Sequence, residues 1–127
     1  MIGKIIYLYI NTSFMLILDK EISRAELANI AESLYGDMVK GVVDVYKGLL
    51  AIDAELHSDL EGMLLNEGSE QNSLWGINLY PAADDEDLIE FDTLINIRPG
   101  HGNSSRDVEN PEICEAISRI VFNFIRG

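Results

Sequence analysis

The chain has 127 residues, the length of a single domain, and its composition of 47% hydrophobic and 24% charged residues excludes an intrinsically disordered protein. Its 22 acidic and 9 basic residues give a formal net charge of −13, which disfavours binding to DNA or RNA because such binding depends on Lys and Arg contacts to phosphates. The single cysteine excludes an internal disulfide bond, so we expect a soluble protein of the cytoplasm.

Residues 1–18 are mostly apolar, but they do not predict a membrane span. The polar residues 11–13 interrupt the run, whereas a membrane-spanning helix needs about 20 consecutive apolar residues. Two interpretations stay open. Either residues 5–10 and 14–18 are strands joined by this polar turn, or Met15 is the true start and everything before it is an upstream extension.

Residues 22–36 are expected to form the first helix. Ser23 and Glu26 have the spacing of a capping box, in which each side chain bonds the backbone N–H of the other residue. The apolar residues of this segment have the i, i+3, i+4, i+7 spacing of one buried helix face: Leu27, Ile30, Ala31 and Leu34. Gly36 then ends the helix.

The next two segments change from helical to strand-like patterns. Residues 38–46 and 49–53 are rich in β-branched residues and are separated by Lys47 and Gly48, which predicts a hairpin. A second helix is expected over 58–67, with Ser58 as its N-cap.

A second hairpin is predicted further along the chain. Apolar and polar residues alternate over 74–80, and Pro81 ends that strand because proline cannot donate to a ladder. Residues 88–98 are the longest strand candidate. The last helix is expected to begin at Asn110, with Pro111 at its first helical position.

This order of elements predicts an α+β fold. We expect a mainly antiparallel sheet of two hairpins, with an N-terminal strand as an open addition, and about three helices packed mostly on one face. The predicted organisation is residues 1–14 as an N-terminal extension or extra strand, and residues 15–127 as a single globular domain.

The loop 98–106 is the first candidate site. It contains two glycines and two of the nine basic residues, and it leads towards a helix N-terminus, where backbone N–H groups favour anions. Pairing of the last two strands would bring polar side chains of the sheet beside this loop. The predicted ligand-binding residues are Asn78, Asn96, Arg98, His101 and Arg106. The same composition is also typical of an ordinary polar loop.

Glu55, His57 and Asp59 are a candidate metal site. In an extended backbone alternate residues point the same way, and two carboxylates with an imidazole can hold Zn²⁺ or a similar cation. A helix that begins at Ser58 would break this geometry before Asp59, and Asp59 would then lie in the first helical turn.

The middle of the chain is strongly acidic. Residues 48–97 contain twelve acidic residues and no Lys or Arg, including the run 84–87. Such a block is typical of a solvated surface. It is also compatible with a surface that binds a cation or a basic partner.

Several short segments form a recognisable pattern: Gly36-Asp37-Met38-Val39-Lys40, Val43-Asp44, Glu55-Leu56-His57, Asp59, Leu74-Trp75-Gly76-Ile77-Asn78-Leu79-Tyr80-Pro81, Asn96-Ile97-Arg98-Pro99 and Gly102-Asn103. Through them the chain, from about Met15 onwards, resembles a family of short uncharacterised prokaryotic proteins of unknown function. The resemblance implies no particular activity.

Three functional hypotheses follow from these patterns. The first is a binding or regulatory module that recognises a small anionic ligand or a protein partner through the loop 98–106. The second is a metal-assisted hydrolase that uses Glu55, His57 and Asp59. The third is an acidic, inhibitor-like protein that binds a basic partner. The sequence specifies neither a reaction nor a cofactor.

Overall fold

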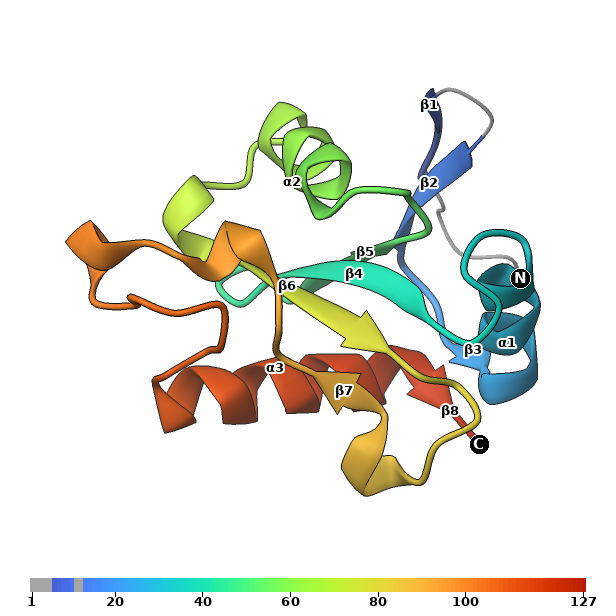
Figure 1. The fold of residues 1–127 in the computed structure, drawn as a ribbon. Helices are drawn as coiled ribbons and strands as arrows, with labels where there is room; N and C mark the ends of the chain where they lie inside the picture. Colours follow the sequence, from blue (N-terminus) through green and yellow to red (C-terminus); the bar gives the residue numbers. More distant parts are fainter. Residues whose placement is uncertain (1–5, 11–12) are drawn as a thin grey trace.

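The computed structural model describes residues 6–10 and 13–127 and confirms the predicted α+β class (Figure 1). Its main sheet has six strands in the order β1-β2-β5-β4-β6-β7, and every neighbouring pair is antiparallel. The strands are β1 (Ile6–Ile10), β2 (Ser13–Leu18), β4 (Val39–Asp44), β5 (Leu49–Ile52), β6 (Leu74–Leu79) and β7 (Ile89–Glu90). A short parallel pair, β3 (Ile22–Ser23) and β8 (Ile125–Arg126), joins the C-terminus to the start of the first helix.

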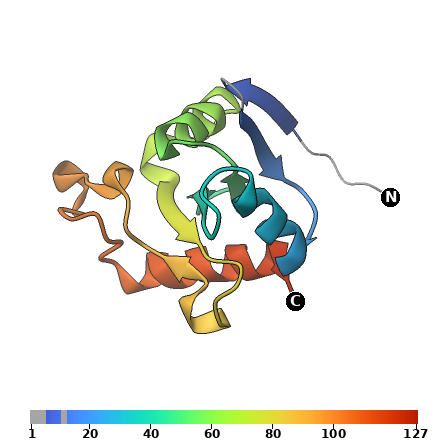
Figure 2. The same cartoon turned by 45° about the vertical axis from the view of Figure 1, so that its right-hand side comes forward.

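Within the described residues, three helices cover the two faces of this sheet (Figures 1 and 2). α1 (Arg24–Glu32) and α3 (Pro111–Phe124) pack on one face, where they share a core with Val43, Ile77 and Leu79 of the sheet. α2 (His57–Asn66) packs on the opposite face over Val42 and Leu74. Short 3₁₀ helices occupy the connections: η1 (Gln71–Ser73), η2 (Asp85–Asp87), η3 (Leu94–Asn96) and η4 (Pro99–His101).

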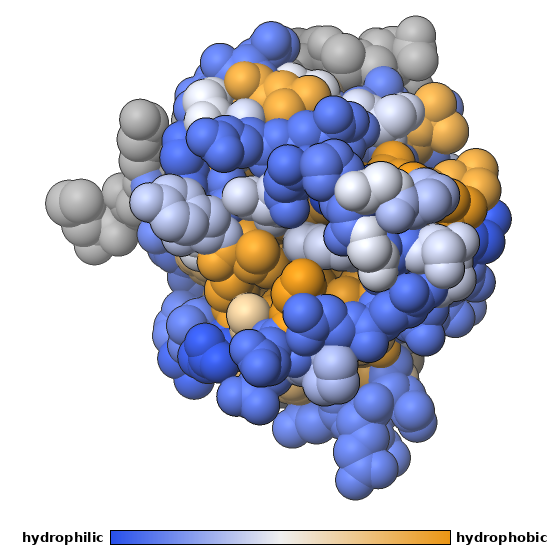
Figure 3. Space-filling view, turned by 90° about the vertical axis from the view of Figure 1, so that its left-hand side faces the viewer, coloured by the Kyte–Doolittle hydropathy of each residue, from blue (hydrophilic) through white to orange (hydrophobic). Residues whose placement is uncertain are grey.

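Hydrophobic as well as hydrophilic residues reach the surface (Figure 3). On the face seen in Figure 3, hydrophobic residues gather in the middle and hydrophilic residues surround them. No helix in the described residues is long and apolar enough to cross a bilayer.

Capping residues in the sequence predict correctly where α1 and α3 begin. The Ser23 side chain accepts a hydrogen bond from the Glu26 N–H, and Glu26 accepts one from the Ser23 N–H, so the predicted capping box is present. α3 begins at Pro111 behind Asn110, whose side chain accepts from the Glu112 N–H. The first hairpin, β4–β5, is also confirmed.

Three predicted boundaries are wrong. α1 ends at Glu32, with Ser33 as its C-cap, and not at Gly36. α2 begins at His57 and not after Ser58, and its N-cap residue, Leu56, has no side-chain cap. The predicted strand 88–98 pairs only over Ile89 and Glu90, after which the chain leaves β6 and turns through η3. The reason is a long-range contact, because the Asn96 side chain bonds the backbone of Gly76 in place of a strand ladder.

Asp53, which follows β5, has an unusual backbone and an unusual carboxyl group. Its φ of 76° lies in the left-handed region, which Asn and Asp tolerate better than most residues. Burial raises the pKa of its carboxyl from 3.8 to about 6. The folded state therefore holds this proton more tightly than the unfolded chain, and the stability associated with Asp53 falls as pH rises from about 4 to about 6.

Replacement of Asp53 by Asn is expected to stabilise the protein at neutral pH. Asn retains the backbone preference and removes the cost of ionising a half-buried carboxyl. The full shift corresponds to about 3 kcal/mol, and solvent screening reduces the expected gain to about 1 kcal/mol. Urea denaturation at about pH 8 checks the gain, and at about pH 4 the two proteins should be equally stable. The control is Asp19→Asn at an exposed position. An equal gain at both pH values would contradict the assignment.

Candidate functional site

Three polar side chains lie side by side on the face of the sheet that α2 partly covers. The register places Lys40 of β4 opposite Asn78 of β6, and Asn78 opposite Glu90 of β7. Directly opposed residues on antiparallel strands share one face. Lys40 is two residues from Val42, which packs under α2, so the row lies on the α2 side of the sheet.

A cleft of about 460 Å³ opens over this row, next to the first turn of α2. We name it the His57 cleft. It is lined by Met38, Lys40, Leu56, His57, Ser58, Asn78, Tyr80, Glu90, Asp92, Thr93, Leu94, Ile95 and Arg106. The lining therefore comes from β4, the start of α2, the ends of β6 and β7, the segment that crosses β6, and the loop 98–106.

Two cations reach this cleft. The Lys40 Nζ donates to the Glu55 carbonyl oxygen at 2.7 Å and lies 4.9 Å from the centre of the Tyr35 ring. The Arg106 Nε donates to Asp92 Oδ1 at 2.6 Å, and half of the Arg106 side chain is exposed. Within the described residues the terminal guanidinium nitrogens of Arg106 form no hydrogen bond, so they can bind a ligand.

His57 lies between these cations and the sheet. Its Nε2 is 2.9 Å from the carbonyl oxygen of Ile77, which assigns a proton to Nε2 because a carbonyl only accepts. Burial, followed by the positive charges of Lys40 and Arg106, holds the pKa of His57 below its ordinary value, although the bond to Ile77 and the nearby Asn78 amide oppose the shift. His57 is therefore neutral near pH 7, and its Nδ1 retains a lone pair.

The α2 N-terminus adds further donors. The first N–H groups of a helix have no partner within the helix, and at α2 no side chain caps them. Leu56, His57 and Ser58 line the cleft, so the positive end of the helix dipole lies at its edge.

Asn78 and Glu90 form the opposite wall. The Asn78 Nδ2 donates to Glu90 Oε1 at 2.9 Å and to the Asp92 carbonyl oxygen at 3.2 Å. The Tyr80 hydroxyl donates to the same Glu90 oxygen at 3.1 Å. Asn78 is only 6% exposed, and its Oδ1 has no hydrogen-bond partner in the described residues. Buried acceptors without a partner are rare in proteins.

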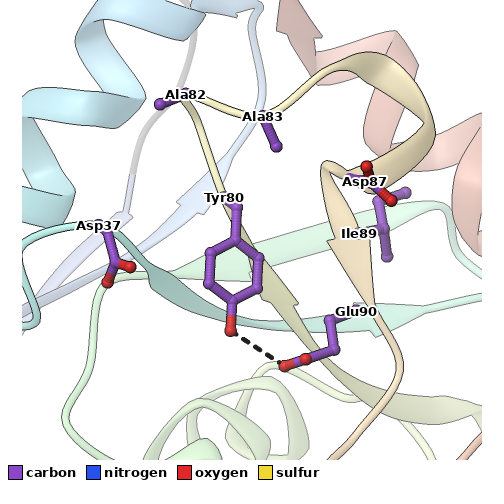
Figure 4. A pocket seen from close by; sticks show the side chains of 7 residues that line it. All are labelled: Asp37, Tyr80, Ala82, Ala83, Asp87, Ile89 and Glu90. Atoms are coloured by element: carbon purple, nitrogen blue, oxygen red, sulfur yellow. Dashed lines mark hydrogen bonds between the residues drawn. The ribbon is translucent and has the colours of Figure 1, made fainter.

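Tyr80 and Glu90 also border a second, open hollow of about 590 Å³ (Figure 4). Asp37 and Asp87 lie on either side of the Tyr80 ring in this view, and the Tyr80–Glu90 hydrogen bond closes one end. We name it the acidic hollow. Burial and the neighbouring Glu90 raise the pKa of Tyr80, so its hydroxyl keeps its proton at physiological pH.

The loop 98–106 does not bring its basic residues together. The Arg98 guanidinium donates to the carbonyl oxygens of Ile95, Gln71 and Leu74, and it lies 4.8 Å from the centre of the Trp75 ring. His101 is exposed in η4. Arg98 thus joins the loop to η1 and β6, and Arg106 is the basic residue of this loop that lines the His57 cleft.

The two predicted amide residues have different environments. Asn78 lines the cleft, whereas Asn96 is fully buried and bonds the backbone of Gly76 and Arg106. The sequence interpretation did not include Lys40 or Glu90. Lys40 could have been predicted from strand alternation, because it is two residues from Val42 and therefore lies on the same face of the strand.

Glu55, His57 and Asp59 do not form a metal-binding group. No set of three His, Cys, Asp or Glu side chains in the described residues is close enough to hold a metal ion. α2 begins at His57, so Glu55 and Asp59 do not share the extended backbone that the metal prediction needs. The Nε2 of His57 is also occupied by Ile77.

Comparison with known proteins identifies one family. A family model described as "Protein of unknown function (DUF5674)" matches residues 16–124. A search of curated proteins and a search of solved structures found no match.

Proposed function

The chain belongs to the DUF5674 family of proteins of unknown function, and we propose that it binds a small organic anion in the His57 cleft. One observation carries this proposal. Lys40, Arg106 and the uncapped N-terminus of α2 line a single cleft in a chain whose net charge is −13.

Lys40 and Arg106 lie near the same side chain of the cleft. Burial is the main cause that lowers the pKa of His57, and the positive charges of Lys40 and Arg106 lower it further. An anion there also meets backbone N–H groups and the terminal nitrogens of Arg106, which supply charge-assisted hydrogen bonds. Leu56 and Leu94 are 55% and 67% exposed at the edge, and they support a ligand with an apolar part.

We expect 4-methylpentanoate to bind in this cleft and its neutral amide to bind at least about tenfold more weakly, because only the acid is attracted by the cations. Titration followed by ¹H–¹⁵N NMR should shift the backbone signals of Lys40, His57 and Ser58. Arg106→Ala and Lys40→Met should each weaken binding of the acid by about tenfold. Neither change removes a core side chain.

Arg119→Ala is the matched control, because Arg119 forms an exposed ion pair with Glu115 on α3. It should leave the affinity unchanged. The proposal is rejected if the acid and the amide bind equally, or if the acid shifts no signal of the cleft.

The acidic hollow supports a second candidate function, the binding of a basic partner. Asp37, Asp87 and Glu90 surround it, and no Lys or Arg side chain of the described residues lines it. A cationic side chain of a protein partner would fit this charge. Arg106→Ala and Lys40→Met leave this hollow intact, so they distinguish the two candidates. For either function we favour a cytoplasmic location, which the free thiol of Cys114 supports.

A further inference from the structure

The His57 cleft contains acceptors as well as cations. Asn78 donates through Nδ2 to Glu90 and Asp92, which fixes the orientation of the amide and leaves Oδ1 on its other side. This Oδ1 is buried and has no partner in the part of the chain that the structure describes. A buried acceptor without a partner is unfavourable, so a ligand N–H group that bonds it would stabilise the complex.

Glu90 provides a negative charge next to this acceptor. One of its oxygens receives the Asn78 amide and the Tyr80 hydroxyl, so the carboxylate is held in place. Its Oε2 makes no hydrogen bond within the described residues and is an available acceptor. His57 also lines the cleft beside Asn78. An ammonium group is the ligand group that satisfies several acceptors and a carboxylate at once.

From these contacts we infer that the ligand of the His57 cleft is an α-amino acid with an apolar side chain. This inference rests on the proposed anion-binding function. The carboxylate binds at Lys40, Arg106 and the start of α2, and the ammonium group binds at Glu90 and Asn78. The apolar side chain lies against Leu56 and Leu94.

The strand order keeps the two charged residues within reach of one small ligand. Lys40 and Glu90 are on β4 and β7, with β6 between them, so their backbones are about 10 Å apart and both residues are on the α2 face of the sheet.

Three probes with the same apolar part test the inference: leucine, 4-methylpentanoate, which lacks the ammonium group, and 3-methylbutylamine, which lacks the carboxylate. The full chain is titrated with each, and the cleft signals are followed by ¹H–¹⁵N NMR. Leucine is expected to bind at least about tenfold more tightly than either of the other two, because only leucine bonds both ends of the cleft.

Glu90→Gln removes the charge and keeps an oxygen that accepts from Asn78 and Tyr80. It should reduce the affinity for leucine to about that for 4-methylpentanoate without weakening the binding of the acid. Glu112→Gln, at an exposed position of α3, is the control and should change neither affinity.

Different outcomes contradict the amino-acid inference and the anion-binding proposal. Equal binding of leucine and 4-methylpentanoate, or unchanged leucine binding in Glu90→Gln, overturns the amino-acid inference and leaves anion binding supported. Cleft binding of 3-methylbutylamine alone, or of no probe, overturns both.

Discussion

Replacement of Gly76 by alanine is expected to destabilise the protein by about 3 kcal/mol or more, because β6 and the segment that crosses it have no room for a methyl group. A Cβ at this position would overlap Thr93 Oγ1 and would lie 2.9 Å from Ile95 Cγ1 and 3.0 Å from Thr93 Cβ. Rotation of the Thr93 side chain moves Oγ1 but not Cβ, so it does not relieve the clash. The crossing segment must move away from β6.

The backbone around the clash resists such a movement. The Thr93 N–H donates to the Arg106 carbonyl oxygen at 3.1 Å, and Asn96 holds both backbone groups of Gly76. Urea denaturation of Gly76→Ala measures the loss of free energy of unfolding. Because Thr93 and Ile95 line the His57 cleft, the same substitution is expected to weaken binding there.

Gly62→Ala is the matched control for this substitution. Gly62 lies within α2, and nothing is within 4 Å of a Cβ added there. Alanine has the higher helix propensity, so we expect a gain of up to about 1 kcal/mol. A loss below about 1 kcal/mol in Gly76→Ala would show that the segment 92–96 is not held against β6.

Replacement of Asn96 by alanine is expected to cost about 3 kcal/mol, because it leaves the N–H and the carbonyl oxygen of Gly76 without the side chain that bonds them. Asn96 is 0% exposed. Its Oδ1 accepts from the Gly76 N–H at 2.8 Å, and its Nδ2 donates to the Gly76 and Arg106 carbonyl oxygens at 3.0 and 3.1 Å. The side chain therefore pairs with β6 as a neighbouring strand would.

Two measurements check the role of Asn96. Urea denaturation should show the loss in stability, and hydrogen exchange at the Gly76 amide should accelerate more than at amides in the middle of α3. Asn123→Ala is the control, because Asn123 is exposed on α3 and alanine there should change stability little. Slow exchange at Gly76 in Asn96→Ala would mean that another group had replaced the side chain, which would contradict this account.

The sequence correctly predicted the elements that depend on residues only a few positions apart. The capping box of Ser23 and Glu26, the Asn110-Pro111 start and the β4–β5 hairpin are examples. The register of β4 with β6 does not follow from burial alone, because both faces of these strands are buried and a shift by one residue would only exchange the two faces.

Other features depended on contacts between distant segments. The segment 91–98 alternates like a strand, but Asn96 and Arg98 bond the backbone of Gly76, Leu74 and Gln71 and turn it across β6. Ser23 predicted the start of α1 correctly, whereas Ser58 did not predict the start of α2, because no side chain caps α2.

The α+β class, the starts of α1 and α3, the first hairpin and the acidity of the middle of the chain could all be predicted from the sequence. Each of these depends on residue type and short-range spacing. The sequence did not predict that Arg98 is bonded to backbone carbonyls while Arg106 reaches a cleft with Lys40, His57 and Asn78. These residues come from separate elements, and only the strand pairing and the packing of α2 bring them together.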